Sequence, residues 1–327
     1  MKRIQNIRIA NFLLQSSEVC KINLSFQTFG LPIGMAPIVL VNHALTGNSN
    51  VAGENGWWND VVGENKVIDA KKYTIIAFNI PGNGYNNDAE NLIENYKSFT
   101  TKDIASLFWK GLEYLKVNQL FAVIGGSLGG AIVWEMAFIK PNAIQNLVPI
   151  ATNWKANDWL IGNVLVQDAI LNNSKNPIHD ARLHAMLLYR TPESLTAKFN
   201  SERNRNQNSY KVESWLLHHG EKLTNRFELS AYKLMNHLLK TIGENTTEKD
   251  LQDFAKISPT KIHQIAINSD YFFAPNENIK THNLLSNISK NLTYHEINSI
   301  HGHDAFLIEY ERLNHILKTI FNTKQTH

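Results

Sequence analysis

The sequence predicts an α/β fold in which helices flank a mostly parallel central sheet. Short apolar, β-branched runs recur along the chain with helical patterns between them, which is the alternation expected of such a sheet. In chain order, the runs that predict strands lie at 38–42, 73–78, 120–124, 146–150, 261–268 and 292–297. The helical patterns, each with apolar residues at three- and four-residue spacing, lie at 101–115, 129–138, 278–288 and 305–320.

Two parts of the chain depart from this alternation. Residues 4–14 and 19–29 precede the first unit and predict an opening antiparallel hairpin. Between about residue 152 and residue 257 the strand-like runs vanish, and helical segments take over at 159–171, 181–189, 212–218 and 229–239. We therefore expect a core domain formed by residues 1–151 and 258–327, and a helical lid formed by residues 152–257 over one edge of the sheet.

Composition limits the class of protein. A chain of 327 residues with 43% hydrophobic content can bury one large core. The 32 Lys and Arg residues nearly balance the 29 Asp and Glu residues and form no dense cluster of one sign, so nucleic acid is not a favoured partner. No apolar run approaches the ~20 residues that span a bilayer. The single cysteine, Cys20, suits a reducing compartment, and we expect a soluble, cytoplasmic protein with no membrane association.

The strongest local signal is a glycine-rich turn around Ser127. Residues 125–130, Gly-Gly-Ser-Leu-Gly-Gly, follow one predicted strand and open a predicted helix. A serine at such a turn is held in a strained backbone conformation, and the residues two before and two after it must be small. Gly125 and Gly129 fill these places, so Ser127 is the candidate nucleophile of an α/β-hydrolase fold. The alternative is a glycine-rich turn whose serine only caps the helix.

A serine nucleophile needs a histidine base and a carboxylate that orients the base. Among 13 histidines, His303 lies between the last predicted strand and the final predicted helix, where a residue reaches the C-terminal edge of the sheet. Asp270 ends the preceding strand. The order serine, acid, histidine is the one that this scaffold uses, so Ser127, Asp270 and His303 are the predicted triad. His301 is the rival base, and Asp270 alone would fit a turn aspartate.

An oxyanion hole needs two backbone N–H donors. Leu128, directly after the nucleophile, is expected to supply one. The other is expected from residues 43–47, His-Ala-Leu-Thr-Gly, which follow the strand at 38–42, and Leu45 is the candidate. His43 itself is interpreted as a structural hydrogen-bonding residue.

With these motifs in place, the chain resembles the homoserine O-acetyltransferases, α/β-hydrolase-fold enzymes of methionine biosynthesis. The similar segments are 43–47, Gly-Trp-Trp at 56–58, 125–130, Trp-Glu at 134–135, Leu-Tyr-Arg at 188–190, Val-Glu-Ser-Trp-Leu at 212–216, Ser-Asp at 269–270 and Gly-His-Asp-Ala-Phe-Leu at 302–307. The segments 43–47 and 302–307 are the most specific. One departure is the loop after residues 73–78, where residues 82–85 run into the polar segment 86–91 in place of the family's Gly-Ser-Thr-Gly-rich loop.

The resemblance implies a two-step acetyl transfer from acetyl-CoA, a co-substrate, through Ser127 to the side-chain hydroxyl of L-homoserine. By position, Arg190 matches the arginine that holds the amino acid's carboxylate, and Asp304 matches the acidic residue that binds its ammonium group. The alternative for Arg190 is a cation that stabilises a helix C-terminus. The resemblance also implies a homodimer.

Other functions remain open from the sequence. The same triad would serve a hydrolase that uses water, or an acyltransferase that uses succinyl-CoA or L-serine. A third hypothesis is a ligand-binding protein that keeps the scaffold without catalysis, which an intact triad disfavours. The sequence holds no phosphate-binding loop, dinucleotide fingerprint or zinc motif, so we expect no metal and no bound redox cofactor.

Overall fold

A mostly parallel eight-stranded sheet forms the centre of the structure, a computed structural model that describes residues 4–85, 91–204 and 208–321. Its order is β1-β2-β6-β3-β7-β8-β11-β12, and all neighbours from β6 to β12 pair in parallel. The strands are β1 (Gln5–Leu13), β2 (Val19–Gly30), β3 (Ile38–Asn42), β6 (Thr74–Phe78), β7 (Leu120–Gly126), β8 (Ile144–Ile150), β11 (Lys261–Ile267) and β12 (Leu292–Ile297). The α/β-hydrolase fold class is confirmed, with every expected strand present.

The opening hairpin is confirmed as well. β1 and β2 pair antiparallel with Gln5 opposite Phe26, and β2 then pairs antiparallel with β6, with Phe26 opposite Phe78. The hairpin therefore extends one edge of the parallel sheet. A short parallel pair, β4 (Val62–Gly63) and β5 (Ile68–Asp69), lies outside the main sheet and was not expected from the sequence.

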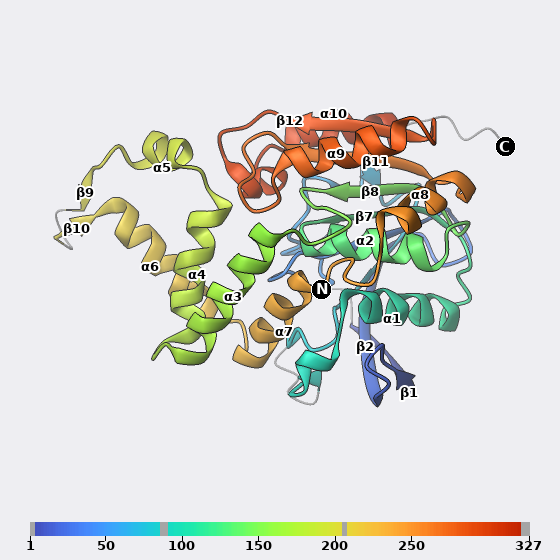
Figure 1. The fold of residues 1–327 in the computed structure, drawn as a ribbon, viewed down its shortest axis with the longest axis horizontal. Coiled ribbons are helices and arrows are strands. Elements are labelled where there is room, and N and C mark those ends of the chain that lie inside the picture. Colours follow the sequence, from blue (N-terminus) through green and yellow to red (C-terminus); the bar gives the residue numbers. More distant parts are fainter. Residues whose placement is uncertain (1–3, 86–90, 205–207, 322–327) are drawn as a thin grey trace.

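Helices cover both faces of the sheet (Figure 1). On one face lie α1 (Thr101–Tyr114), α2 (Leu128–Ile139) and α8 (Glu248–Ile257), whose apolar residues join a single buried cluster. The opposite face is covered by α10 (Tyr310–Phe321) and by the segment around Trp58, which form a second cluster. Burial of apolar surface on both faces explains why the central strands are almost wholly apolar.

The chain between β8 and β11 is mainly helical, and α3 to α6 project beyond the sheet on the left of Figure 1. Its elements are α3 (Asp158–Asn173), α4 (Pro177–Tyr189), α5 (Pro192–Phe199), α6 (Lys211–Thr224), α7 (Leu229–Lys240) and α8. The sequence prediction missed α5 and α8, and it also missed the two-residue strands β9 (Arg203–Asn204) and β10 (Ser209–Tyr210). The division of the chain into a core domain and a separate lid domain at residues 152 and 257 stays a prediction.

The predicted helix at 305–320 is wrong over residues 305–309. Residues Gly302–Leu307 form a 3₁₀ helix, η4, and α10 begins only at Tyr310. Ile308 and Glu309 both donate backbone hydrogen bonds to the Ala305 carbonyl, which closes the 3₁₀ turn before the α-helix starts. This break separates His303 from the regular packing of α10 and leaves it at the sheet edge. The helix expected at 278–288 begins earlier, as α9 (Pro275–Ser286).

Some residues that bear on the sequence-based expectations lie outside the part of the chain that the structure describes. Residues 86–90 of the altered loop after β6 lie outside the described residues, as do residues 205–207. Within the described ranges, no helix is long and apolar enough to cross a membrane.

Candidate active site

Ser127 occupies the sharp turn between β7 and α2. Its backbone torsions are φ 57° and ψ −125°, a conformation that residues other than glycine rarely adopt. A Cβ placed on Gly125 would lie 2.6 Å from the Gly129 carbonyl, and a Cβ on Gly129 would lie 2.5 Å from the Asn42 carbonyl oxygen. Only glycine therefore lets β7, α2 and the end of β3 approach so closely, as the sequence pattern predicted.

The three predicted triad residues lie in hydrogen-bond contact. His303 Nε2 lies 2.8 Å from Ser127 Oγ, and His303 Nδ1 lies 2.7 Å from Asp270 Oδ2. With the proton on Nδ1, the imidazole donates to the carboxylate and accepts from the serine hydroxyl. All three residues are at least 95% buried. This arrangement can move a proton from Ser127 to His303, while the buried carboxylate favours the imidazolium that forms.

The Asp270 oxygen that does not contact His303 accepts hydrogen bonds from the backbone. This oxygen, Oδ1, accepts hydrogen bonds from the N–H groups of Phe272 at 2.7 Å and Phe273 at 2.9 Å. The turn interpretation that the sequence left open is therefore also correct, because Asp270 bonds the following backbone and His303 at the same time. These backbone bonds fix the carboxylate in the orientation that His303 needs.

Aromatic rings enclose the imidazole of His303. Phe273 stacks on it with ring centroids 5.6 Å apart, and Tyr189, Phe272 and Phe306 contact it at 5.4, 5.2 and 5.8 Å. Burial raises the pKa of Tyr189 to about 12, so its hydroxyl stays protonated. These rings, which we call the aromatic wall, were not predicted from the sequence, although Phe272 and Phe273 follow directly after Asp270 and Tyr271 in the chain. The wall limits access of water to the imidazole.

The rival histidine does not reach the serine. His301 Nδ1 lies 2.9 Å from Ser194 Oγ at the start of α5, so it links α5 to the segment before η4. Trp57 and Trp58 stack on each other with centroids 5.1 Å apart, and Trp58 is fully buried in the second core cluster. These three residues have structural contacts outside the triad.

The two proposed oxyanion donors lie at the expected places. Leu128 is the first residue of α2, and Leu45 lies in the loop after β3. Neither backbone N–H donates a hydrogen bond to another described residue, as expected for donors that face a reacting carbonyl oxygen. Their role in catalysis stays a prediction.

His43 fastens the loop that contains Leu45. Its Nδ1 donates to the Ala44 carbonyl at 2.7 Å, and its Nε2 accepts from the Ile80 N–H at 2.9 Å. The side chain is fully buried, and burial lowers its pKa to about 4, so the ring is neutral near pH 7. The sequence-based interpretation of His43 as a structural residue agrees with these contacts.

Arg190 and Asp304, the two residues expected to bind the amino acid, pair with each other. Arg190 Nε donates to Asp304 Oδ2 at 3.1 Å, and the two side chains are 16% and 19% exposed. Arg190 follows the last residue of α4, and Asp304 follows His303 in η4. The guanidinium lies 5.9 Å from the ring of Trp215 in α6. The pair thus stands beside the triad and remains partly accessible, and its role in binding stays a prediction.

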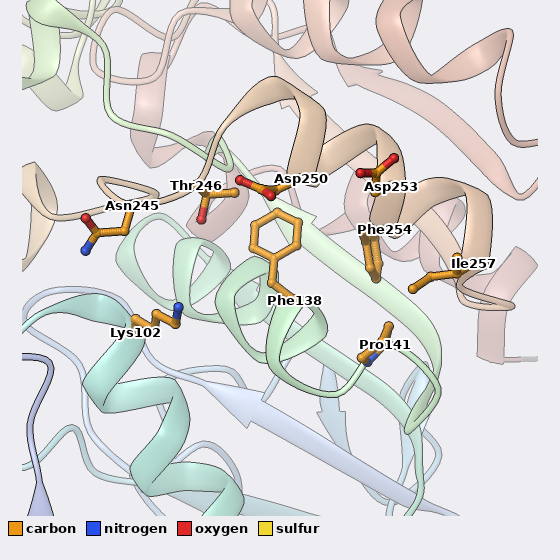
Figure 2. A pocket seen from close by; sticks show the side chains of 9 residues that line it. All are labelled: Lys102, Phe138, Pro141, Asn245, Thr246, Asp250, Asp253, Phe254 and Ile257. Atoms are coloured by element: carbon orange, nitrogen blue, oxygen red, sulfur yellow. The ribbon is translucent and has the colours of Figure 1, made fainter.

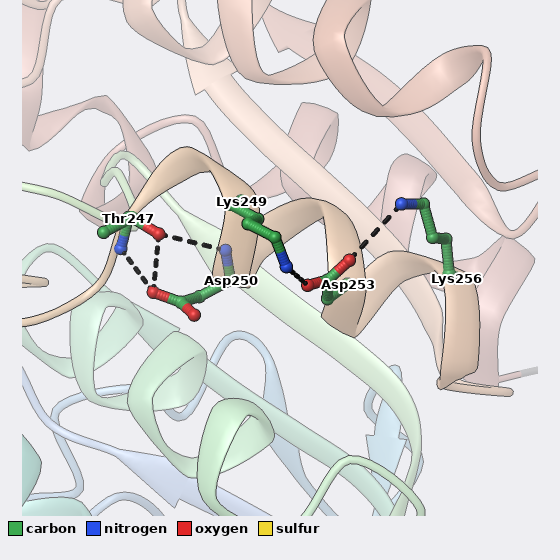
Figure 3. A network of polar contacts seen from close by, with 5 residues as sticks. All are labelled: Thr247, Lys249, Asp250, Asp253 and Lys256. Carbon is green, nitrogen blue, oxygen red and sulfur yellow. Dashed lines mark hydrogen bonds and ion pairs between the residues drawn. The ribbon is translucent and has the colours of Figure 1, made fainter.

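A surface hollow of about 350 Å³ lies between α2 and α8, and no triad residue lines it (Figure 2). Its two carboxylates are already engaged, as Figure 3 shows. Thr247 caps α8, and the Asp250 carboxylate accepts hydrogen bonds from the Thr247 N–H and hydroxyl, while Asp253 pairs with Lys249 and Lys256. Both carboxylates of the hollow are therefore occupied by neighbouring groups. Within the described residues, no cluster of His, Cys, Asp or Glu is arranged to hold a metal ion.

The turn around Ser127 and the sheet order together define an α/β-hydrolase-fold protein, in which Ser127, His303 and Asp270 are hydrogen-bonded and buried. A sequence profile described as the alpha/beta hydrolase fold matches residues 37–215. A homoserine O-acetyltransferase from Cyclobacterium marinum is 33% identical over 326 residues, which cover 91% of this chain and 89% of the relative. The chain belongs to the homoserine O-acetyltransferase family, a family of acyltransferase enzymes.

Solved structures agree on the fold. The homoserine O-acetyltransferase from Bacillus anthracis has a TM-score of 0.86 and 16% identity, covering 98% of both chains. Esterase E22 has the same TM-score of 0.86 with 15% identity, covering 98% of this chain and all of the esterase. A transferase and an esterase are thus equally similar in shape, so the backbone alone does not separate transfer from hydrolysis.

Proposed function

We propose that this protein transfers an acetyl group from acetyl-CoA to the side-chain hydroxyl of L-homoserine through an acetyl-Ser127 intermediate. The observation that carries the proposal is the continuous hydrogen-bonded line from Ser127 Oγ through His303 to Asp270, with the Arg190–Asp304 pair directly beside it. The membership of the chain in the homoserine O-acetyltransferase family supports the choice of substrates.

In the first half-reaction, Ser127 Oγ attacks the thioester carbonyl while His303 Nε2 takes the hydroxyl proton. The N–H groups of Leu45 and Leu128 stabilise the negative charge that develops on the carbonyl oxygen, and each such donor contributes about 10²–10³ in rate. Collapse of the tetrahedral intermediate breaks the carbon–sulfur bond. His303 then protonates the departing thiolate, which leaves as free CoA.

In the second half-reaction, His303 takes the proton of the homoserine hydroxyl, and the resulting oxygen nucleophile attacks acetyl-Ser127. Collapse of this second intermediate breaks the bond to Ser127 Oγ, and His303 returns the proton to the serine. Arg190 holds the carboxylate of the amino acid and Asp304 holds its ammonium group. A guanidinium and a carboxylate form charge-assisted hydrogen bonds that are worth about 1.5–3 kcal/mol each.

The same triad fits a hydrolase, so the acceptor decides between the two functions. The Arg190–Asp304 pair presents one positive and one negative group, which matches a zwitterionic acceptor better than water. The aromatic wall around His303 limits water at the acyl-enzyme. Succinyl-CoA and L-serine remain the alternative donor and acceptor. Cytoplasmic location, a homodimer, the absence of a bound cofactor and a role in methionine biosynthesis are further parts of the proposal.

Detection of the acyl-enzyme tests the proposal. Protein mixed with acetyl-CoA and quenched with acid is expected to carry one acetyl group on the peptide that contains Ser127, and added L-homoserine is expected to remove it. The Ser127→Ala variant is the control and is expected to stay unmodified. An acetyl group on another residue, or one that homoserine does not remove, would contradict the mechanism.

A further inference from the structure

Two arginines of the helical segment between β8 and β11 have no acidic partner. Arg182 belongs to α4, and Arg226 follows α6. No carboxylate among the described residues lies within ion-pair distance of either guanidinium. Two other cations of this segment do have acidic partners: Arg190 contacts Asp304, and Lys211 contacts Glu202. The positive charges of Arg182 and Arg226 are therefore not compensated locally.

Arg226 reaches the oxyanion loop. Its Nη1 donates a hydrogen bond to the Thr46 carbonyl at 3.0 Å, next to Leu45. The side chain is partly exposed to solvent, and one hydrogen bond leaves most of its five N–H donors free. Its tip thus stands on the side of the site where the carbonyl of the acyl donor must bind.

Arg182 lies one side chain away from the imidazole. Its guanidinium carbon is 5.6 Å from the centroid of the Tyr189 ring, and the Tyr189 ring is 5.4 Å from that of His303. The guanidinium makes no hydrogen bond to another described residue. Because the face of an aromatic ring attracts a cation, Tyr189 holds Arg182 in place without neutralising it.

The charge of Arg182 affects the pKa of neighbouring groups. Burial, and after it the charge of Arg182, lowers the pKa of Arg226. Burial, then Arg182 and other cations, lowers the pKa of His219 to about 4. The region between α4, α6 and the oxyanion loop is therefore electropositive, whereas the Arg190–Asp304 pair beside it is neutral overall.

We propose that Arg182 and Arg226 form an anion subsite on the donor side of Ser127, which binds an oxyanion group carried by the acyl donor. Two guanidinium groups with free donors are suited to a carboxylate or a phosphate, because both present oxygens that accept paired hydrogen bonds. The oxyanion is either the far carboxylate of a dicarboxylic acyl group or a phosphate of CoA. The inference rests on the proposed function, since it assigns these residues to the donor of that reaction.

The experiment measures donor binding without turnover. The Ser127→Ala variant is titrated by calorimetry with acetyl-CoA, with S-acetylpantetheine, which lacks phosphate, and with succinyl-CoA. The titrations are repeated with Arg182→Gln and Arg226→Gln added, singly and together. Arg203→Gln is the matched control, because Arg203 is an exposed arginine of the same segment that stacks on Tyr210. Arg182→Lys and Arg226→Lys keep the charge and serve if a glutamine variant fails to fold.

If a phosphate is the ligand, the double glutamine variant is expected to weaken acetyl-CoA binding about tenfold or more and to change S-acetylpantetheine binding far less. If the acyl carboxylate is the ligand, the ratio of succinyl-CoA to acetyl-CoA affinity is expected to fall by a similar factor. The lysine variants are expected to lose less in either case, and the control to change neither.

Two results would overturn the subsite. They are equal affinities of the arginine variants and the parent for all donors, and equal weakening for all three donors. A different result would contradict the proposed function, namely wild-type protein that transfers no acetyl group to L-homoserine. The donor titrations could still be interpreted in that case, because they measure binding without turnover.

Discussion

Arg190 Nε donates a hydrogen bond to Asp304 Oδ2 at 3.1 Å, and Asp304 directly follows the histidine that contacts Ser127. The bond uses Nε, so the terminal Nη groups of Arg190 are available for a carboxylate. A single ion pair therefore joins the two groups that we expect to grip opposite ends of an amino acid, and it fixes both beside the imidazole.

Replacement of Arg190 by Gln is expected to impair the acceptor half-reaction selectively. Loss of charged hydrogen bonds worth about 1.5–3 kcal/mol corresponds to a rise of about 10- to 100-fold in the KM for L-homoserine. Stopped-flow measurement of CoA release from acetyl-CoA reports the acylation step separately. A loss in acylation as large as the loss with homoserine would rule out the carboxylate role of Arg190.

Replacement of Asp270 by Asn is expected to lower kcat by about 10⁴, because the imidazole then loses the carboxylate that selects its tautomer and favours its charged form. Asn keeps a side-chain oxygen for the N–H groups of Phe272 and Phe273, so the fold is expected to persist. Steady-state kinetics together with a thermal melt separate the two effects. A variant with nearly full kcat would remove Asp270 from the triad.

Replacement of Gly129 by Ala is expected to destabilise the protein by about 1–3 kcal/mol and to lower kcat. The new Cβ would lie 2.5 Å from the Asn42 carbonyl oxygen and 2.6 Å from that of His43, so it would displace the backbone that leads to Leu45. Gly162→Ala in α3 is the matched control, because a Cβ there has no heavy atom within 4 Å. That control is expected to stabilise the helix by about 0.5–1 kcal/mol. Similar unfolding midpoints for the two variants would contradict the packing argument.

His43 is expected to make stability depend on pH. Burial lowers its pKa from 6.5 to about 4, so the unfolded chain binds a proton in this range that the folded protein does not. The stability is complete above pH 6.5 and is lost as the pH falls toward 4, by up to about 3 kcal/mol. Urea unfolding at several pH values measures this loss.

The His43→Gln variant provides the comparison for that experiment. Glutamine can donate to Ala44 and accept from Ile80 as His43 does, but it does not titrate. Its unfolding free energy is expected to fall less steeply than that of the wild type between pH 6.5 and 4. Identical slopes would mean that His43 is not the titrating group.

Much of the fold follows from local patterns in the sequence. The central strands are apolar because both faces of the sheet are covered, so even a short run such as 38–42 was predicted with its observed ends. The turn around Ser127 was predictable because a Cβ at Gly125 or Gly129 would clash with the neighbouring backbone, so both positions require glycine. The order of Ser127, Asp270 and His303 along the chain predicted contacts that span up to 176 residues.

The remaining features depend on contacts that no local pattern encodes. The predicted helix at 305–320 was wrong before Tyr310, because the backbone turns at Ile308 and Glu309 and leaves His303 at the sheet edge. α8 was missed because its Leu251 and Phe254 are buried against the core while the rest of the helix is strongly polar. The positions of Arg182 and Arg226 near the site depend on how the helices pack, so their sequence neighbours gave no sign of them.

The central claim is transfer to an amino acid rather than to water. Its most direct test follows the release of free CoA from acetyl-CoA with and without L-homoserine, with L-serine and succinyl-CoA as the alternative substrates. Acetyl-CoA with L-homoserine is expected to give much the fastest sustained turnover and to yield O-acetylhomoserine. Equal rates of CoA release with and without any amino acid would contradict it and would identify the protein as a hydrolase.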